Sequence, residues 1–258
     1  MHLNALPEST KRVLSRAHGI VELRDHLLIG GTAMTLQVGH RVSEDLDFVQ
    51  FGSKLDRELI AGILSRLRGS DKPELVTSLV ARQTFDNEGE DIDDVHQDWM
   101  VDGTKVTFFC PDRPEELDVL TGAKPLMYGD VPVADLDTIF KLKAMVVAER
   151  WTSRDAFDLL HFVQHQGRDV SEIDEMIRRK LPLYPLTARM ALLTRPFRLV
   201  DPGFQPASSE GPQTLKELAD DMKLMIKRHE STIGGRTASL LKGPNTSPVG
   251  SPPRSRDR

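Results

Sequence analysis

The sequence has little of what stabilises secreted proteins or anchors membrane proteins. It contains one cysteine, Cys110, so neither an intrachain disulfide nor a cysteine-based zinc site can form. No stretch approaches the roughly 20 apolar residues of a membrane span, and the first residues contain no apolar run of the signal-peptide kind. These absences predict a cytoplasmic protein.

Aromatic residues and excess positive charge are also scarce. Aromatics make up 5% of the chain, so we expect a core of Leu, Val, Ile and Met. The 39 acidic and 34 basic residues give a formal charge of −5, and no basic–aromatic alternation marks a platform for stacked bases. A nucleic-acid contact would therefore depend on local cations, of which the candidates are Lys143, Arg150, Arg154, Arg178, Arg179 and Lys180.

Residues 1–133 combine short apolar runs with helical patterns, which is typical of an α/β (α+β) lobe. The runs HLLIGG and LDFVQF predict strands, and SKLDRELIAGILSRLRG predicts a helix that ends at a glycine. Weaker strands are predicted in ELVTSLVARQTF, HQDWMVDGTKVTFFC and GDVPVAD. In the second of these, Asp102–Gly103 is a hairpin-turn signal.

The pattern becomes helical after Pro132. ADLDTIFKLKAMVVAERW and SRDAFDLLHFVQHQG predict two strong helices, the second capped by Ser153, and two more follow before residue 200. We predict an α-helical lobe over 134–200, then a linker and appended helix over 201–230. Residues 231–258 are poor in core-forming side chains and are predicted to be a disordered tail.

One stretch, GGTAMTLQVGHRVSEDLDF from Gly30 to Phe48, suggests chemistry. Two glycines and Thr32 open a helix, where free N–H groups and a hydroxyl can receive phosphate. Asp45 and Asp47 alternate around an apolar residue, so their carboxylates share one side of a strand, repel and raise each other's pKa. Mg²⁺ relieves this repulsion and brings phosphate oxygens with it. Each half alone could be a tight turn or a solvated strand edge, but together they predict a nucleoside-triphosphate site.

The same stretch resembles the signature of the DNA polymerase β-type nucleotidyltransferase superfamily. It is most similar to the AbiEii/AbiGii-type (MenT-like) toxins of type IV toxin–antitoxin systems, in which Gly-Gly-Thr-Ala-x-x-Leu precedes Gly-His-Arg-x-Ser-x-Asp-Leu-Asp-Phe. A second stretch, KAMVVAERWTSRDAFDLLHF, resembles the family's helical motif. The matching residues of that motif are Lys143, Ala144, Arg150, Arg154, Asp155, Asp158 and Leu159. The resemblance covers roughly residues 20–165.

The resemblance implies a two-lobed polymerase β-like fold and Mg²⁺-dependent transfer of a nucleoside monophosphate from an NTP to an acceptor. The implied acceptor is RNA, such as the 3′ end of tRNA, and the implied partner is an antitoxin protein. Asp45 and Asp47 would hold the metal. The other implied catalytic residues are Lys143, Asp155 and Asp158, and the implied nucleotide-binding residues are Gly30, Gly31, Thr32, Arg41, Ser43 and Arg150.

Several of these roles have structural alternatives. Arg41 could pair with Glu44, Arg154 could form an i,i+4 surface salt bridge with Asp158, and Asp155 could serve only as a helix N-terminal charge. The family match implies that either Asp155 or Asp158 faces the active site. Lys143 is seven residues from Arg150 and would share a helix face with it, whereas His40 is expected to be structural.

One departure from the superfamily pattern concerns a third acid on a later strand. The comparable stretch, TKVTFFCP, contains none, and Asp102 and Asp112 lie at its ends. Phosphotransfer, a small-molecule or protein acceptor, and a non-catalytic NTP-binding or interaction role therefore stay open as alternatives.

Overall fold

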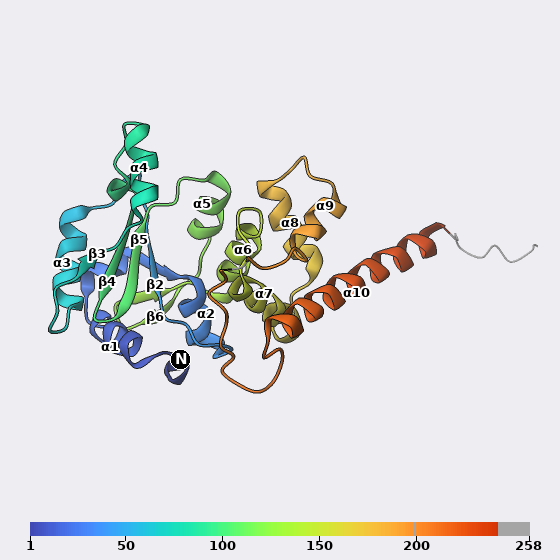
Figure 1. Cartoon of the computed structure of the whole chain (residues 1–258), viewed down its shortest axis with the longest axis horizontal. Coiled ribbons are helices and arrows are strands. Elements are labelled where there is room, and N and C mark those ends of the chain that lie inside the picture. The colour runs from blue at the N-terminus through green and yellow to red at the C-terminus, as the bar shows by residue number, and fades with distance from the viewer. Residues whose placement is uncertain (199, 242–258) are drawn as a thin grey trace, which may run out of the picture.

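A mixed seven-stranded sheet forms the centre of the first lobe in the computed structural model, which describes residues 1–198 and 200–241, the last nine as backbone alone (Figure 1). The strand order is β3-β4-β5-β2-β1-β7-β6. The pairs β2/β5 and β1/β7 are parallel, and the other neighbours are antiparallel. The strands are β1 (His26–Ile29), β2 (Leu46–Gln50), β3 (Glu74–Leu75), β4 (His96–Val101), β5 (Thr104–Phe109), β6 (Leu126–Tyr128) and β7 (Val131–Val133).

Most helices of the first lobe bury apolar residues, whereas α4 (Leu79–Asn87) buries none. The helices are α1 (Glu8–Ala17), α2 (Gly30–Val38), α3 (Arg57–Leu67), α4 (Leu79–Asn87) and α5 (Pro114–Thr121), with short 3-10 turns at Leu3–Ala5, Val21–Asp25 and Ile92–Asp94. In α3, Ile60, Ile63, Leu64 and Leu67 recur at helical spacing and are all buried. Asp56 caps that helix by accepting a hydrogen bond from the Leu59 N–H.

The second lobe consists of α6 (Leu136–Val146), α7 (Ser153–His165), α8 (Val170–Lys180) and α9 (Leu186–Leu192). Helix α6 packs against α2 and α5, so it joins the two lobes next to the stretch that contains the aspartates (Figure 1). The cap of α7 is Thr152, whose side chain accepts from the Asp155 N–H, and not Ser153 as predicted. The Ser153 hydroxyl is used elsewhere, since it hydrogen-bonds Asp201.

Two segments of the first lobe differ from the prediction. The strand expected over ELVTSLVARQTF is limited to Glu74–Leu75, and α4 follows it. The reason is local, because the Ser78 side chain accepts a hydrogen bond from the Ala81 N–H and starts a helix. Helix α5 was not predicted, although Pro114 at its first position and two acids in its first turn are a helix-start signal.

The appended helix α10 (Leu215–Leu241) buries Leu218, Met222, Met225 and Ile226, packs on α7 and α8, and then projects from the lobe (Figure 1). It continues past residue 230, where we expected disorder to begin. A helix once formed propagates readily, and each interior glycine costs it only about 1 kcal/mol. The rest of the predicted tail, 242–258, lies outside the described residues.

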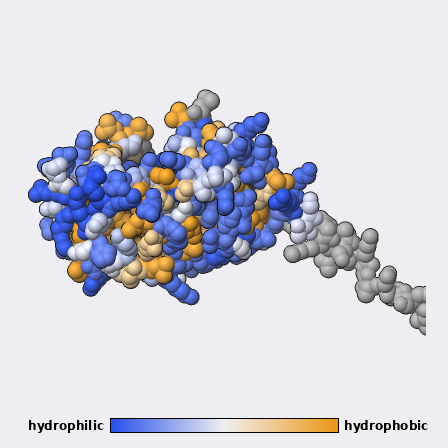
Figure 2. Space-filling model, turned by 90° about the horizontal axis from the view of Figure 1, so that it is seen from below, coloured by the Kyte–Doolittle hydropathy of each residue, from blue (hydrophilic) through white to orange (hydrophobic). Residues whose placement is uncertain are grey.

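The surface is mainly polar. The face in Figure 2 is mostly hydrophilic, with small separate hydrophobic patches. Among the helices of the described residues, none combines the length and the apolar character needed to cross a membrane.

Candidate active site

The turn from β1 into α2 brings a helix N-terminus against the acidic strand β2. Gly30 has a φ of 76°, and a Cβ there would lie 2.6 Å from Asp47 Oδ2. A Cβ on Gly31 would lie 2.9 Å from Ser43 Oγ and would overlap the Arg41 guanidinium. Both positions therefore require glycine, and the free N–H groups of the first turn of α2 are available beside the aspartates.

Thr32 and Ser43 hold the loop that carries Asp45. The buried Thr32 hydroxyl donates to the Asp45 carbonyl and lies 3.0 Å from Ser43 Oγ. Thr32 does not line the cavities described below, and its hydroxyl is engaged by Asp45 and Ser43, so its contact with phosphate stays a prediction. Ser43 lines the smaller cavity.

Asp45 and Asp47 present their carboxylates without a protein partner that satisfies them. Among the described residues, no hydrogen bond or ion pair engages the Asp47 side chain, and Asp45 has one loose contact at 3.8 Å to Arg154. Burial, and then the charge of Asp45, raise the pKa of Asp47. Two uncompensated carboxylates fit Mg²⁺, which takes one or two carboxylates and completes its shell with water and phosphate oxygens. The described residues hold no cluster of three or more His, Cys, Asp or Glu able to bind a metal, so the substrate would supply the other ligands.

Opposite the aspartates, Lys143 belongs to a fully paired, buried cluster. Its Nζ lies 3.0 Å from Asp155 Oδ1 and 2.8 Å from Asp158 Oδ2. Arg41 donates to both oxygens of Asp158, from Nε at 2.6 Å and Nη2 at 2.9 Å. His40 Nε2 lies 2.7 Å from Asp158 Oδ1, which fits its expected structural role. Arg41 therefore pairs with Asp158 and not with Glu44.

The pKa shifts in this cluster follow from its pairing. Burial alone would lower the pKa of Lys143, but the Asp158 and Asp155 carboxylates outweigh burial and raise it. Burial opposes the charged form of Asp158 as well, yet Arg41 and Lys143 hold its pKa well below the usual range. Asp155 lines the smaller cavity whereas Asp158 is completely buried behind it, so Asp155 is the acid that faces the site.

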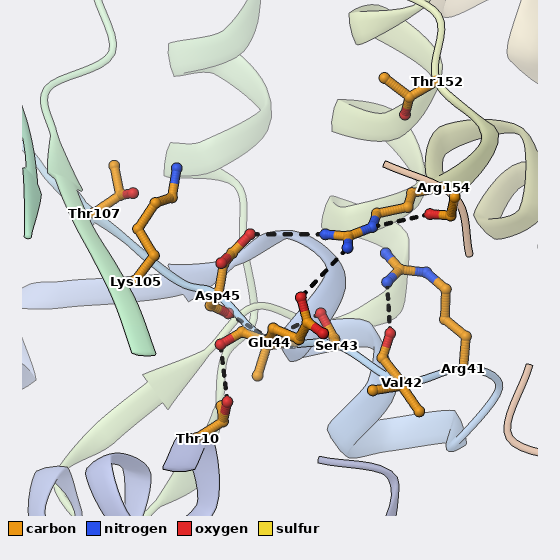
Figure 3. Close-up of polar contacts among 12 residues, drawn as sticks. Thr10, Arg41, Val42, Ser43, Glu44, Asp45, Lys105, Thr107, Thr152 and Arg154 are labelled. Carbon is orange, nitrogen blue, oxygen red and sulfur yellow. Dashed lines mark hydrogen bonds and ion pairs between the residues drawn. The ribbon is translucent and has the colours of Figure 1, made fainter. Parts of the chain in front are cut away.

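Two further arginines reach the site from the turn before α7 and from its first turn. Helix α6 ends at Val146, so Lys143 and Arg150 do not share a helix as predicted, although both line the same cavities. Arg150 Nε lies 3.3 Å from Asp155 Oδ2. Arg154 does not pair with Asp158; it lies between Glu44 at 3.4 Å and Asp45 (Figure 3).

Two cavities meet at these residues. The smaller, of about 170 Å³, is mainly polar, and its cationic lining residues are Arg41, Lys143, Arg150 and Arg154. The larger, of about 490 Å³, opens between the sheet and α5 and α6, and its wall includes Leu120, Ile139, Leu142 and Val146. Both cavities share Gly31, Asp47, Lys143 and Arg150. The Asp47 carboxylate and the Lys143 ammonium thus stand at the junction.

Sequence reasoning missed a polar row on β4 and β5. Asp47 pairs in register with Thr107, and Thr107 pairs with Asp98, so all three side chains lie on one face of the sheet. Figure 3 shows Lys105 and Thr107 on the side of Asp45 away from Arg154. Counting outward from the predicted Asp102–Gly103 turn would have placed Asp98 opposite Thr107. Asp102 itself pairs with Arg12 and Arg16, and Asp112 is exposed.

The basic cluster on α8 is largely engaged in ion pairs. Arg179 contacts Asp118 at 2.9 Å, and the buried Lys180 ammonium pairs with Glu116 and Glu149. These pairs tie α8 to α5 and to the turn after α6. Of the candidate RNA-contacting cations, Lys143, Arg150 and Arg154 are therefore the ones at the site.

The chain is similar to one known protein family, to a protein from another organism and to several solved structures. The family model described as "Nucleotidyl transferase AbiEii toxin, Type IV TA system" matches residues 12–234. An uncharacterised protein of Aquifex aeolicus, aq_aa25, is 25% identical over 194 residues, which are 69% of this chain and 77% of that protein. The crystal structure of JHP933 from Helicobacter pylori is similar with a TM-score of 0.47 at 16% identity, covering 92% of this chain and 98% of that one. MenT4, a nucleotidyltransferase toxin from Mycobacterium tuberculosis, is similar with a TM-score of 0.48 at 15% identity, covering 85% and 84%.

Proposed function

The chain belongs to the AbiEii nucleotidyltransferase toxin family of type IV toxin–antitoxin systems, and from this premise we propose that it transfers a nucleoside monophosphate from an NTP to RNA with the help of Mg²⁺. The proposed acceptor is the 3′ end of tRNA. Membership of a toxin–antitoxin family also implies an antitoxin partner. We place the reaction in the cytoplasm, where NTPs and tRNA meet.

The observation that carries the proposal is the Asp47 carboxylate, which has no hydrogen-bond or ion-pair partner among the described residues and lies between a glycine-built helix N-terminus and a buried lysine. A protein does not keep such a carboxylate ionised without compensation, because burial and the neighbouring Asp45 both oppose its charge. Mg²⁺ held by Asp45 and Asp47 would supply that compensation and polarise the α-phosphate for attack.

The chain's own residues supply the rest of the site. The N–H groups at Gly30 and Gly31 and the cations of the smaller cavity bind and orient the triphosphate, as expected of a reaction that depends on positioning and charge stabilisation. Asp155 and Asp158 fix the Lys143 ammonium at the junction and keep it protonated. Arg41 is held by Asp158 on both oxygens, so it presents its guanidinium to the smaller cavity in one orientation.

RNA as the acceptor is supported by the size and apolar wall of the larger cavity more than by charge. The larger cavity leads from Asp47 past an apolar wall, which suits the ribose and base at the end of a nucleic-acid strand. The chain as a whole is acidic, so extended binding of the phosphate backbone is not expected. The proposal is therefore recognition of an RNA end.

The test incubates the protein with Mg²⁺, total cellular RNA and each α-³²P-labelled NTP in turn. The double variant Asp45→Ala/Asp47→Ala is the inactive control. Asp220→Ala, which removes an exposed ion pair on α10, is the matched active control. We expect label on a discrete RNA, dependent on Mg²⁺ and absent from the double variant.

Other results would redirect the assignment. Label transferred from a γ-³²P-NTP and not from an α-labelled one would identify a phosphotransferase instead. Label on protein in place of RNA would change the acceptor class. Mg²⁺–NTP binding by thermal shift with no transfer to any acceptor would contradict nucleotidyl transfer and favour a non-catalytic binding protein.

A further inference from the structure

The two cavities suggest from which side the acceptor arrives. In nucleotidyl transfer the attacking and leaving oxygens lie roughly in line on either side of the α-phosphorus. The smaller cavity carries the cations that suit the leaving pyrophosphate, and Asp47 stands where the two cavities meet. The attacking hydroxyl then approaches from the larger cavity, along the face of β5 and β4.

That approach path contains a histidine beside a carboxylate. His96 Nε2 lies 3.2 Å from Asp98 Oδ1, and the His96 side chain is 39% exposed. The same oxygen accepts a hydrogen bond from Thr107 Oγ1 at 2.7 Å and lies 3.5 Å from Lys105 Nζ. Thr107 is in turn the register neighbour of Asp47. The row Asp47–Thr107–Asp98 crosses three neighbouring strands, and His96 lies on the same face of the sheet, two residues from Asp98 on β4.

Other groups that line the larger cavity are less suited to accept a proton. Burial opposes ionisation of Asp98, but the contacts with His96, Thr107 and Lys105 prevail and lower its pKa, which makes it a weak base. Glu116 and Glu149 are tied to Lys180. Histidine is the side chain whose protonation changes most readily near neutral pH. The charged groups that line the larger cavity with His96 are Asp47 on β2, Asp98 on β4, Lys105 on β5, Glu116 on α5, Lys143 on α6, and Glu149 and Arg150 in the turn after α6.

We propose that His96 is the general base for the acceptor hydroxyl and that Asp98 is its positioning residue, an inference that rests on the proposed function. In this proposal Nε2, the ring nitrogen nearer Asp98, carries the proton of the neutral ring, and Nδ1 takes the proton of the acceptor hydroxyl. As the acceptor O–H bond breaks, its electron pair forms the new bond from oxygen to the α-phosphorus. The bond from that phosphorus to the bridging oxygen breaks, and pyrophosphate leaves with the electron pair. Asp98 stabilises the imidazolium that results.

The experiment measures single-turnover transfer to total tRNA between about pH 5 and pH 8, with Mg²⁺ and an equimolar mixture of the four α-³²P-labelled NTPs. The variants are His96→Gln, His96→Ala with and without added imidazole, and Asp98→Asn. His165→Gln is the matched control, because His165 is an exposed histidine on α7 away from the cavities. NTP binding is measured separately by thermal shift on every variant.

We expect the wild-type rate to rise with pH through one ionisation, and the control variant to match it. His96→Gln should lower the rate about 100-fold and remove that ionisation, while NTP binding is retained. Imidazole should restore part of the activity of His96→Ala, a rescue that a structural role would not produce. Asp98→Asn should lower the rate while NTP binding is retained, since it removes the carboxylate that positions the His96 ring.

Two results would overturn the inference. If His96→Gln transfers at the wild-type rate with the wild-type pH profile, His96 is not the base although nucleotidyl transfer stands. If the rate falls only in proportion to a loss of NTP binding, His96 is a binding residue. Wild-type protein that binds Mg²⁺–NTP and transfers nothing would overturn the proposed function and this inference together, which separates the two failures.

Discussion

Two groups of carboxylates lie on either side of the smaller cavity, and they differ in how far they are paired with other protein groups. On the helical lobe, both Asp155 and Asp158 are paired with cations. Asp158 contacts three residues, Lys143, Arg41 and His40, and Asp155 also contacts Lys143. On the sheet, Asp47 has no hydrogen-bond or ion-pair partner among the described residues, and Asp45 has one loose contact. The electrostatics follow, since the pKa of Asp158 is lowered and that of Asp47 is raised.

This difference in pairing separates the residues that stabilise the site from those that are available to bind a ligand. A buried ion pair must be complete, because removing one partner leaves an uncompensated charge. Two neighbouring carboxylates without a cation destabilise the fold, and they are tolerated only where a bound ligand offsets that free-energy cost. Substitutions on the two sides should therefore have opposite effects on stability and similar effects on activity.

The largest effect is expected from Asp47→Asn, and the quantity affected is the rate of nucleotidyl transfer. The amide keeps the shape but cannot compensate a cation, so transfer should fall by about 10³-fold or more. The raised pKa of Asp47 means that its charge disfavours the fold, and that stability is lost as pH rises through the folded-state pKa. Without metal, the variant should thus have a higher Tm than wild type at neutral pH. Scanning calorimetry with and without Mg²⁺ checks both signs.

If the Tm of Asp47→Asn without metal were lower than that of the wild type, the claim that the unpaired Asp47 carboxylate destabilises the fold would be wrong. The comparison would also break if Mg²⁺ stabilised the variant as much as it stabilises wild-type protein.

Asp158→Asn should have the opposite effect on folding. It leaves Arg41 and Lys143 buried without their shared counter-ion, at a cost of about 3–5 kcal/mol in the free energy of unfolding. Because the folded-state pKa of Asp158 is lowered, its contribution is present at neutral pH and is lost as pH falls through that pKa. Urea unfolding at neutral and acidic pH measures this. A variant as stable as wild type at neutral pH would show that the buried pairing does not matter.

The sequence predicted residues that the structure brings together, but not how they pair. Gly30, Gly31, Asp45 and Asp47 could be proposed as neighbours because strand alternation and helix-terminus chemistry are local. Two partners of Asp158, Arg41 and His40, lie more than 100 positions away in the sequence, so spacing could not show that Asp158 would pair with Arg41 and not with Arg154. Local patterns that looked clear, such as the i,i+4 spacing of Arg154 and Asp158, lost to this tertiary pairing.

The same limit applies to the fold. The Asp102–Gly103 hairpin was predicted correctly, with φ values of 50° and 77°, because such a turn demands particular residues. The segment at 74–85 was predicted to be a strand because its apolar residues suit either structure, and one cap at Ser78 decided for helix. Asp98 was missed because its proximity to Asp47 depends on the pairing of three strands, β2, β5 and β4.

A smaller effect on stability is expected from Gly31→Ala. The new methyl group would overlap an Arg41 side chain that Asp158 holds in place and would crowd Ser43 Oγ at 2.9 Å, at a cost of about 1–3 kcal/mol. The matched control is Gly62→Ala, which lies in α3 with no heavy atom within 4 Å of the new Cβ. That change should stabilise the protein by up to about 1 kcal/mol. Equal effects of the two substitutions would show that the contact between Gly31 and Arg41 is not tight.

The smallest effect on stability is expected from Arg154→Ala. Arg154 lies between the two groups of carboxylates, and the substitution tests whether this arginine binds the ligand or stabilises the fold. Its partner Glu44 is 58% exposed, and such pairs contribute about 0–1 kcal/mol. Arg154 Nε also donates to the Gly203 carbonyl, a bond worth about 1 kcal/mol, so the free energy of unfolding should fall by only about 1 kcal/mol. If Arg154 binds triphosphate, the KM for NTP should rise about 5- to 10-fold with kcat retained, the signature of lost ground-state binding. Arg57→Ala, which removes an exposed arginine on α3, is the control. A fall in kcat with an unchanged KM would instead place Arg154 in the transition state, next to Lys143. Arg154 would then act with the carboxylates and Lys143 in the transfer step and not only in binding the NTP.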